Sequence, residues 1–219
     1  MAVLSDFIAS GGGVTPLDFP KFQVSSREIV PYVFGQNTGT FLDITQNLSS
    51  NKVYSVPFYI PQDVEINGVT IFTGGTAFSS TASGLGIYRI NTSSAALGAA
   101  VATASDLSSF SATNQRYTAL VPSSLLTRGW YYFSINAGDA DATIGSYASS
   151  SSSSGILPAS FNAFNLFPSN SIIDATLMRS SSRFVSFITD SVVNGAPPAG
   201  LTLDTPRQVY APYFRLVMA

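Results

Sequence analysis

Carboxylates are the side chains with the clearest potential for chemistry in this sequence. The 219 residues include no His and no Cys, which excludes a Ser-His-Asp triad, a thiolate nucleophile and a disulfide framework. Acid–base chemistry would therefore need paired carboxylates, as in glycoside hydrolysis. Glu28 and Glu65 are the only glutamates, and most of the aspartates occupy turn-like positions where they bond to the backbone. We therefore expect a protein that is not an enzyme.

Motifs for metal or phosphate binding are incomplete. Asp139 and Asp141 would give two oxygen ligands to Ca²⁺, but the rest of a calcium loop does not follow them. The run Gly11–Gly13 lacks the Lys-Ser/Thr pair of a phosphate-binding loop. We interpret the acidic pair as a solvated turn and expect no metal and no cofactor.

Aromatic side chains offer a second kind of chemistry, the stacking of sugar rings. Trp130, Tyr131 and Tyr132 are consecutive in a strand-like run, so their side chains alternate between the two faces of a sheet. At least one of them should be exposed or covered by a partner. These three residues are candidates for glycan stacking, with the core or a subunit contact as the alternative.

Low charge is the most informative feature of the composition. Charged residues make up 10% of the chain, against about 25% in typical proteins. The net charge of -2 gives no basic footprint for nucleic acid or for an anionic membrane. No apolar run approaches the length of a membrane span, so we expect no membrane insertion. Such a weakly charged surface suits a protein that is partly covered by other subunits.

Short alternating runs predict an all-β fold. In Lys52–Ile60, every second side chain from Tyr54 to Ile60 is apolar, which is typical of a strand with one buried face. Pro57 lies on the other face and favours an edge or a bulge. Asn67-Gly68 indicates a hairpin turn or a bulge in the next run. Eight to ten such strands, separated by turn signals, predict a β-sandwich or jelly roll.

The ends of the predicted sandwich carry two unusual segments. Residues 1–26 are rich in Gly and Pro and predict an extended N-terminal arm, and the sandwich domain follows at 27–219. A Ser-rich loop is predicted near 145–155. The arm is either a frayed terminus or a peptide that docks on a partner. The docking residues would be Leu4, Phe7, Ile8, Leu17, Phe19 and Phe22.

Several strand segments resemble a module of tailed-bacteriophage virion proteins. The resemblance rests on LSSNKVYSVPFYIP at Leu48–Pro61, GLGIYR at Gly84–Arg89, the strand Tyr117–Val121 and LLTRGWYYFSI at Leu125–Ile135. It covers less than half of the chain. The sequence departs from the usual motif at Trp130-Tyr131-Tyr132, where Tyr-Trp is expected, and in the Ser-rich loop that follows. The start, MAVLSDFIASGGG, is similar to that of phage tail-fibre and appendage proteins.

The resemblance implies a non-enzymatic structural component of a bacteriophage particle. Such a protein would dock by its N-terminal arm and project the sandwich as a tail fibre, a baseplate appendage or a head decoration. Its expected partners are copies of itself, as a homotrimer, and other virion proteins. It would be assembled in the cytoplasm of the host bacterium and reside in the virion. The alternative is a carbohydrate-binding module that recognises host surface glycans.

Overall fold

We analysed a computed structural model of the chain. It describes residues 23–147 and 185–219, apart from 26, 30, 34–40, 61, 92–93, 95, 205 and 209–210. All six predicted docking residues (Leu4, Phe7, Ile8, Leu17, Phe19 and Phe22) lie outside the described residues, as does the Ser-rich loop beyond Tyr147.

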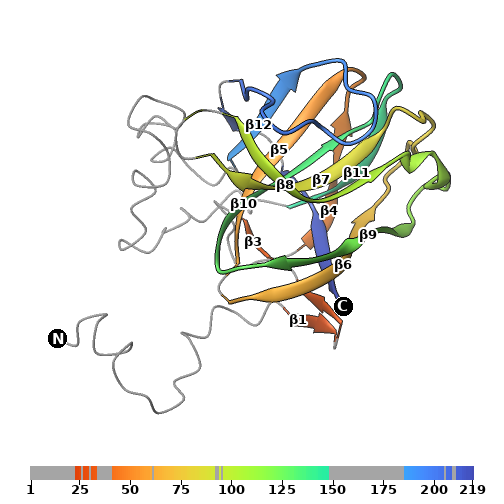
Figure 1. The fold of residues 1–219 in the computed structure, drawn as a ribbon. Coiled ribbons are helices and arrows are strands. Elements are labelled where there is room, and N and C mark those ends of the chain that lie inside the picture. Colours follow the sequence, from red (N-terminus) through yellow and green to blue (C-terminus); the bar gives the residue numbers. More distant parts are fainter. Residues whose placement is uncertain are drawn as a thin grey trace, which may run out of the picture.

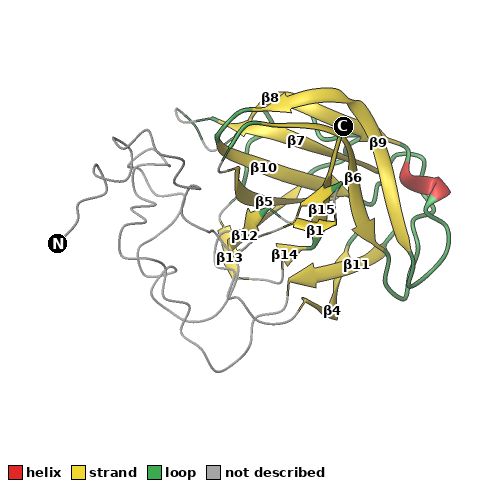
Figure 2. Ribbon diagram, turned by 90° about the horizontal axis from the view of Figure 1, so that it is seen from below, coloured by secondary structure: helices red, strands yellow, loops and turns green. Residues whose placement is uncertain are grey.

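Strands make up nearly all of the regular structure in the described part (Figures 1 and 2). The strands are β1 (Gln23–Ser25), β2 (Glu28–Ile29), β3 (Tyr32–Val33), β4 (Phe41–Leu48), β5 (Lys52–Ile60), β6 (Val64–Phe72), β7 (Gly84–Ile90), β8 (Leu97–Ser105), β9 (Arg116–Leu126), β10 (Gly129–Asn136), β11 (Ala142–Tyr147), β12 (Val185–Asp190), β13 (Pro206–Gln208), β14 (Ala211–Pro212) and β15 (Phe214–Met218). One 3-10 turn, η1 (Leu107–Ser109), interrupts them.

The eight consecutive strands β4 to β11 pair as a nested series. Strand β7 pairs with β8, β6 with β9, β5 with β10 and β4 with β11, all of them antiparallel. Strand β10 also pairs with β7, and β11 meets Thr73, the residue after β6, at an isolated bridge between Thr73 and Ile144. The strands therefore form two layers. One is β5-β10-β7-β8, and the other combines two sheets, β4-β11 and β6-β9, which meet at the single bridge. This is a long hairpin folded over itself, the jelly-roll arrangement, and it confirms the predicted all-β sandwich.

One apolar cluster fills the space between the layers. Tyr54, Val56, Phe58 and Ile60 of β5 are all buried in it, as their alternation predicts. The facing layer contributes side chains such as Phe214 of β15. The core therefore draws on both layers, and burial of these side chains is the main source of stability.

Two backbone irregularities are placed where the sequence signals them. Pro57 lies in β5, whose outer edge is paired by β12 only up to Ser55 and by β3 only from Phe58. Pro57 lacks an N–H donor and fits this break between two partner strands. Gly68 lies at a register shift between β6 and β9, so Asn67-Gly68 marks a bulge and not a hairpin turn.

The last strands of the chain fill a gap in the second layer. Strands β11 and β6 diverge beyond their bridge, and β14 pairs with β11 while β15 pairs with β6. The other edge of β15 pairs with β2, and β2 pairs with β1. Residues 23–25 thus belong to this sheet, although the sequence assigns them to the arm.

A loop covers the outer face of the β5-β10-β7-β8 layer. We call residues 194–204 the strap. The hydroxyl of Tyr88 donates a hydrogen bond to the Pro197 carbonyl, and Nδ2 of Asn136 donates one to the Gly195 carbonyl at 2.7 Å. Near β8, the backbone N–H of Leu97 donates to the strap at 2.9 Å. With the strap on the outer face and the core on the inner face, side chains on both faces of this layer are buried.

Gly84 gives a direct test of the strap. A Cβ at Gly84 would lie 2.3 Å from the backbone carbon of Gly195, so alanine would push the strap away. We expect Gly84→Ala to lower the free energy of unfolding by about 1–3 kcal/mol. Urea denaturation measures this, with Gly75→Ala as the matched control, because a Cβ at Gly75 meets nothing within 4 Å. Equal unfolding midpoints for the two variants would contradict the prediction.

Candidate functional site

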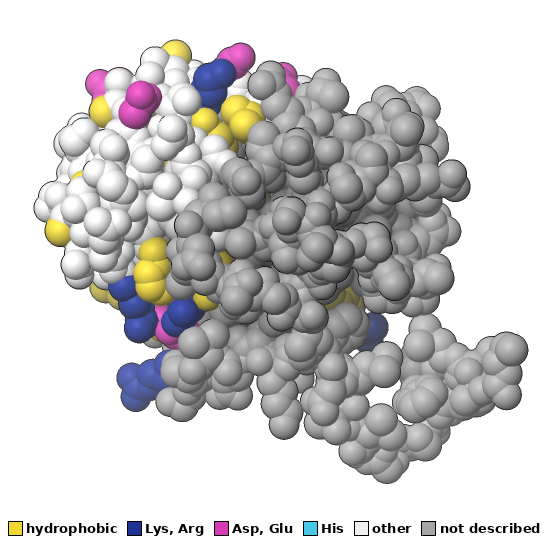
Figure 3. Space-filling model, turned by 180° about the vertical axis from the view of Figure 1, so that it is seen from behind, with side chains coloured by type: hydrophobic (Ala, Val, Ile, Leu, Met, Phe, Trp, Pro, Cys, Tyr) yellow, Lys and Arg dark blue, Asp and Glu magenta, His cyan; other side chains and the backbone are white. Residues whose placement is uncertain are grey.

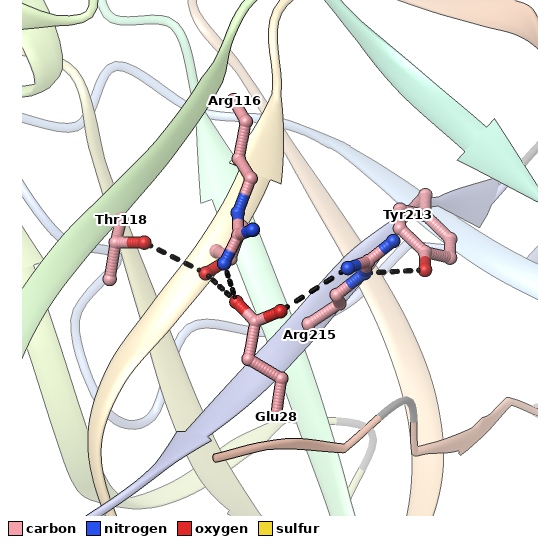
Figure 4. A network of polar contacts seen from close by, with 6 residues as sticks. Glu28, Arg116, Thr118, Tyr213 and Arg215 are labelled. Atoms are coloured by element: carbon pink, nitrogen blue, oxygen red, sulfur yellow. Dashed lines mark hydrogen bonds and ion pairs between the residues drawn. The ribbon is translucent and has the colours of Figure 1, made fainter. Parts of the chain in front are cut away.

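A buried carboxylate organises the outer face of the second layer. Glu28 of β2 is 4% exposed. Its Oε1 accepts a hydrogen bond from the hydroxyl of Thr70 at 3.0 Å and pairs with Arg116. Its Oε2 pairs with Nη1 of Arg215 at 3.2 Å. The Thr70 and Thr118 hydroxyls lie 2.8 Å apart and extend the network to β9 (Figure 4).

Arg215 is held on several sides. Its Nε donates a hydrogen bond to the Tyr213 hydroxyl at 2.8 Å, and its guanidinium lies 5.0 Å from the centre of the Phe72 ring. Burial lowers the pKa of Arg215, but the bonds to Tyr213 and Glu28 outweigh burial and raise the pKa above its ordinary value. Arg215 therefore stays protonated.

This network connects four strands that are distant in sequence. Glu28 lies on β2, Arg215 on β15, Thr70 on β6 and Arg116 on β9. Charge-assisted hydrogen bonds are stronger than neutral ones, so the network fastens the segment that follows the predicted arm to the sandwich. The other glutamate, Glu65, is exposed and accepts a bond from the Ser123 hydroxyl at 2.7 Å. The two glutamates therefore have separate partners.

Next to the network, β9 presents an exposed row of side chains. Arg116, Thr118 and Leu120 alternate along the strand and are all exposed, and we call them the β9 strip. The Arg116 side chain is 53% exposed and Leu120 is 80% exposed. In register, Leu120 lies opposite Gly68 on β6, which in turn lies opposite Val217 on β15. The strip combines an arginine with an exposed apolar side chain, and both kinds of residue occur at protein–protein interfaces.

The three predicted glycan-stacking residues lie in different environments. Tyr131 is 1% exposed and belongs to the core, where its ring stacks on Phe58 at 5.7 Å. Tyr132 is 2% exposed on the opposite face and meets the ring of Phe187 edge-on. Neither ring is open to a sugar, because other side chains cover both. The stacking prediction is corrected for these two tyrosines and remains open for Trp130.

Half-buried Trp130 joins a small cluster at one end of the sandwich. Its ring lies 5.2 Å from that of Tyr59, tilted by 50°. Nε of Arg128 donates a hydrogen bond to the Tyr59 hydroxyl at 3.0 Å. The backbone N–H of Arg128 donates a second one to Oδ1 of Asp63 at 2.7 Å. The hydrogen bond to the Tyr59 hydroxyl is the main cause that raises the pKa of Arg128. Two rings, a cation and a carboxylate could together contact a sugar.

Burial of two tyrosines makes the protein sensitive to alkali. Burial raises the pKa of Tyr88 and Tyr132 well above the ordinary value of about 10. Above that pH the unfolded chain releases these protons and the folded chain keeps them, so the free energy of unfolding falls as pH rises. We expect a loss of about 1.4 kcal/mol per pH unit for each tyrosine. Urea denaturation from pH 9 to 12 measures this loss, and a Tyr132→Phe variant should lose less.

Acidic residues elsewhere serve the backbone and neighbouring side chains. Asp139 accepts a hydrogen bond from the Ser80 hydroxyl, and Asp141 accepts one from the Ser50 backbone N–H at 2.6 Å. Within the described residues, no three acidic side chains gather as metal ligands. The predicted turn at Asp139–Asp141 thus has structural hydrogen-bond partners.

Sequence reasoning did not predict the Glu28 network. Glu28 is 88 residues from Arg116 and 187 residues from Arg215, and no local pattern links them. The only signal was the scarcity of charge. The chain has only two glutamates, and Glu28 lies in a short strand. Such a residue is a candidate for a buried ion pair.

The fold defines a class, an eight-stranded jelly-roll sandwich with added strands at its N- and C-terminal ends. No protein-family model matches the chain, and no curated protein matches it either. Among the residues that the structure describes, none forms a helix that is long and apolar enough to cross a membrane.

Proposed function

We propose that this protein is a non-enzymatic structural component of a bacteriophage particle. It docks by its N-terminal arm and projects the sandwich as a tail fibre, a baseplate appendage or a head decoration, in contact with further copies of itself. The observation that carries the proposal is the nested pairing of β4 to β11. Jelly rolls of this kind build viral capsid domains, and the segments that resemble phage virion proteins fall on β5, β7, β9 and β10.

The surface supports the same proposal. Seen from behind, on the side opposite to that in Figure 1, most of the described surface carries neither charged nor hydrophobic side chains (Figure 3). Uncharged, hydroxyl-rich surface loses little solvation energy when it is covered by another subunit. The exposed β9 strip adds an apolar side chain to it. Individually weak contacts between such surfaces become strong when many copies sit on one particle.

Purified phage particles test this proposal. Tailed particles from the strain that encodes the chain should contain it in a fixed number of copies, measured by quantitative mass spectrometry. A chain that lacks residues 1–22 should keep its fold by circular dichroism, because β1 begins at Gln23, but should be lost from particles. Particles without the full-length chain would contradict the proposal.

A second candidate function is the recognition of host surface glycans. The observation that favours it is the cluster of Trp130, Tyr59 and Arg128, since jelly rolls also occur in lectins. A glycan array should then show binding that Trp130→Ala reduces at least about tenfold. The exposed residue Val192 provides the control variant Val192→Ala. Equal binding by both variants would contradict a role for this cluster.

A further inference from the structure

The β9 strip has an electrostatic character of its own. Arg116 and Arg215 face one carboxylate, that of Glu28, so the network keeps one positive charge in excess. Arg215 is largely covered, whereas the Arg116 side chain is 53% exposed. The excess positive charge is therefore presented to solvent at Arg116, four residues from Leu120 on the same face of β9.

The apolar part of the strip is uncovered in the single chain. Leu120 is 80% exposed, and its neighbour across the strand pair is Gly68, which has no side chain. Beyond Gly68, Val217 is half-buried on β15. Burial of a leucine side chain favours association, so an occupant of this face would gain from the apolar contact as well as from the cation.

The first part of the chain has the matching chemistry. Between residues 1 and 20, Asp6 and Asp18 are the only charged residues, a net charge of -2. Leu4 and Ile8 flank Asp6 at a spacing of two residues, so an extended chain would place all three on one side. Leu4 and Ile8 would then be about 13 Å apart, the same spacing as Arg116 and Leu120 along β9, and Asp6 would lie midway, level with Thr118.

We propose that residues 4–8 of one copy dock on the β9 strip of a neighbouring copy, with Ile8 against Leu120 and Asp6 opposite Thr118, where the long Arg116 side chain reaches it diagonally. This inference rests on the proposed function and names the partner of its arm. The arm leaves from β1, which lies at the opposite edge of the same sheet from β9. Its 22 residues extend up to about 75 Å, which is ample for reaching another copy.

Cysteine cross-linking tests the docking, because the chain has no cysteine of its own. One full-length chain carries Ile8→Cys, and a second, tagged to differ in mass, carries Leu120→Cys. The two are mixed and oxidised, and disulfide-linked heterodimers are measured on a non-reducing gel. We expect heterodimers to exceed both homodimers. Heterodimers that are no more abundant than those with a Val192→Cys chain, which has its cysteine at an 84% exposed position, would overturn the inference.

The charge contact has its own readout. Adding Asp6→Lys to the Ile8→Cys chain should lower the yield of heterodimer about fivefold, and added salt should lower the yield of the unchanged pair. A yield that responds to neither would overturn the contact between Asp6 and Arg116. If the chain is present in particles but forms no heterodimers, this inference is wrong and the proposed function stands. If the chain forms heterodimers but is absent from particles, the proposed function is wrong and the docking contact stands.

Discussion

Replacement of Glu28 by alanine is expected to lower the free energy of unfolding by about 3–5 kcal/mol, as happens when one partner of a buried ion pair is removed. Glu28 is 4% exposed and bonds to Thr70, Arg116 and Arg215. Without the Glu28 carboxylate, Arg215 remains a largely covered cation next to Arg116. Urea denaturation of the full chain measures the loss.

The matched control for this variant is the other glutamate. Glu65 is exposed, and the Ser123 hydroxyl donates its hydrogen bond, so Glu65→Ala should change the free energy of unfolding by less than about 0.5 kcal/mol. If the two glutamate variants unfold at the same urea concentration, the Glu28 network contributes nothing and the account of the sheet is wrong.

A double-mutant cycle separates the two arginines. The Arg215 side chain is 14% exposed and that of Arg116 is 53% exposed, so solvent screens the second pair more strongly. The coupling of Glu28→Ala with Arg215→Met should therefore exceed its coupling with Arg116→Met. The reverse order would mean that the exposed pair dominates.

Local pattern was sufficient to predict the β-sandwich. Alternation along Lys52–Ile60 identified the buried face of β5 correctly, and Asn67-Gly68 indicated the bulge in β6 as one of two alternatives. Both features depend on neighbours along the chain, where the side-chain period of a strand is a strong signal. The nested strand order agrees with the jelly-roll alternative among the predicted sandwich types.

Other elements depend on contacts that the sequence does not display. Strand β8 (Leu97–Ser105) is built mainly from small residues with low strand propensity, and it forms because β7 pairs with it. Residues 145–147 were assigned to the Ser-rich loop, but they belong to β11, which pairs with β4 and β14. Pairing with distant strands overrides the local preference in both cases.

The outer face of the β5-β10-β7-β8 layer is covered, and this explains why Tyr132, predicted as a candidate for glycan stacking, is buried. Alternation correctly put Tyr131 and Tyr132 on opposite faces of β10, and one of the two faces was expected to be exposed or covered by a partner. The strap, from residues 194–204 of the same chain, covers that face, and Phe187 of the neighbouring strand β12 packs against Tyr132 on it. Sheet periodicity shows that a face is apolar, but it does not show which later segment covers it.

Truncation of Phe214 to alanine should destabilise the fold about as much as the Glu28→Ala substitution. Phe214 is fully buried, and its ring stacks on Phe133 at 4.1 Å and meets Phe58 edge-on at 5.2 Å. We expect Phe214→Ala to lower the free energy of unfolding by about 3–5 kcal/mol, through lost burial and the cavity that remains. Urea denaturation measures it, with Val217→Ala on the same strand as the control, since Val217 is only half-buried.

The position of Phe214 makes this variant informative about the topology as well as the core. Strand β15 lies where β6 and β11 diverge, and Phe214 pairs with Ile71 of β6. If β15 holds the open layer together, amide hydrogen exchange in Phe214→Ala should speed up first in residues 66–71 and 145–147, which bond to β14 and β15 or to Tyr213. The β7–β8 pair, at the far end of the other layer, should keep its protection until global unfolding. Equal acceleration in both regions would show that the C-terminal strand contributes only to the common core.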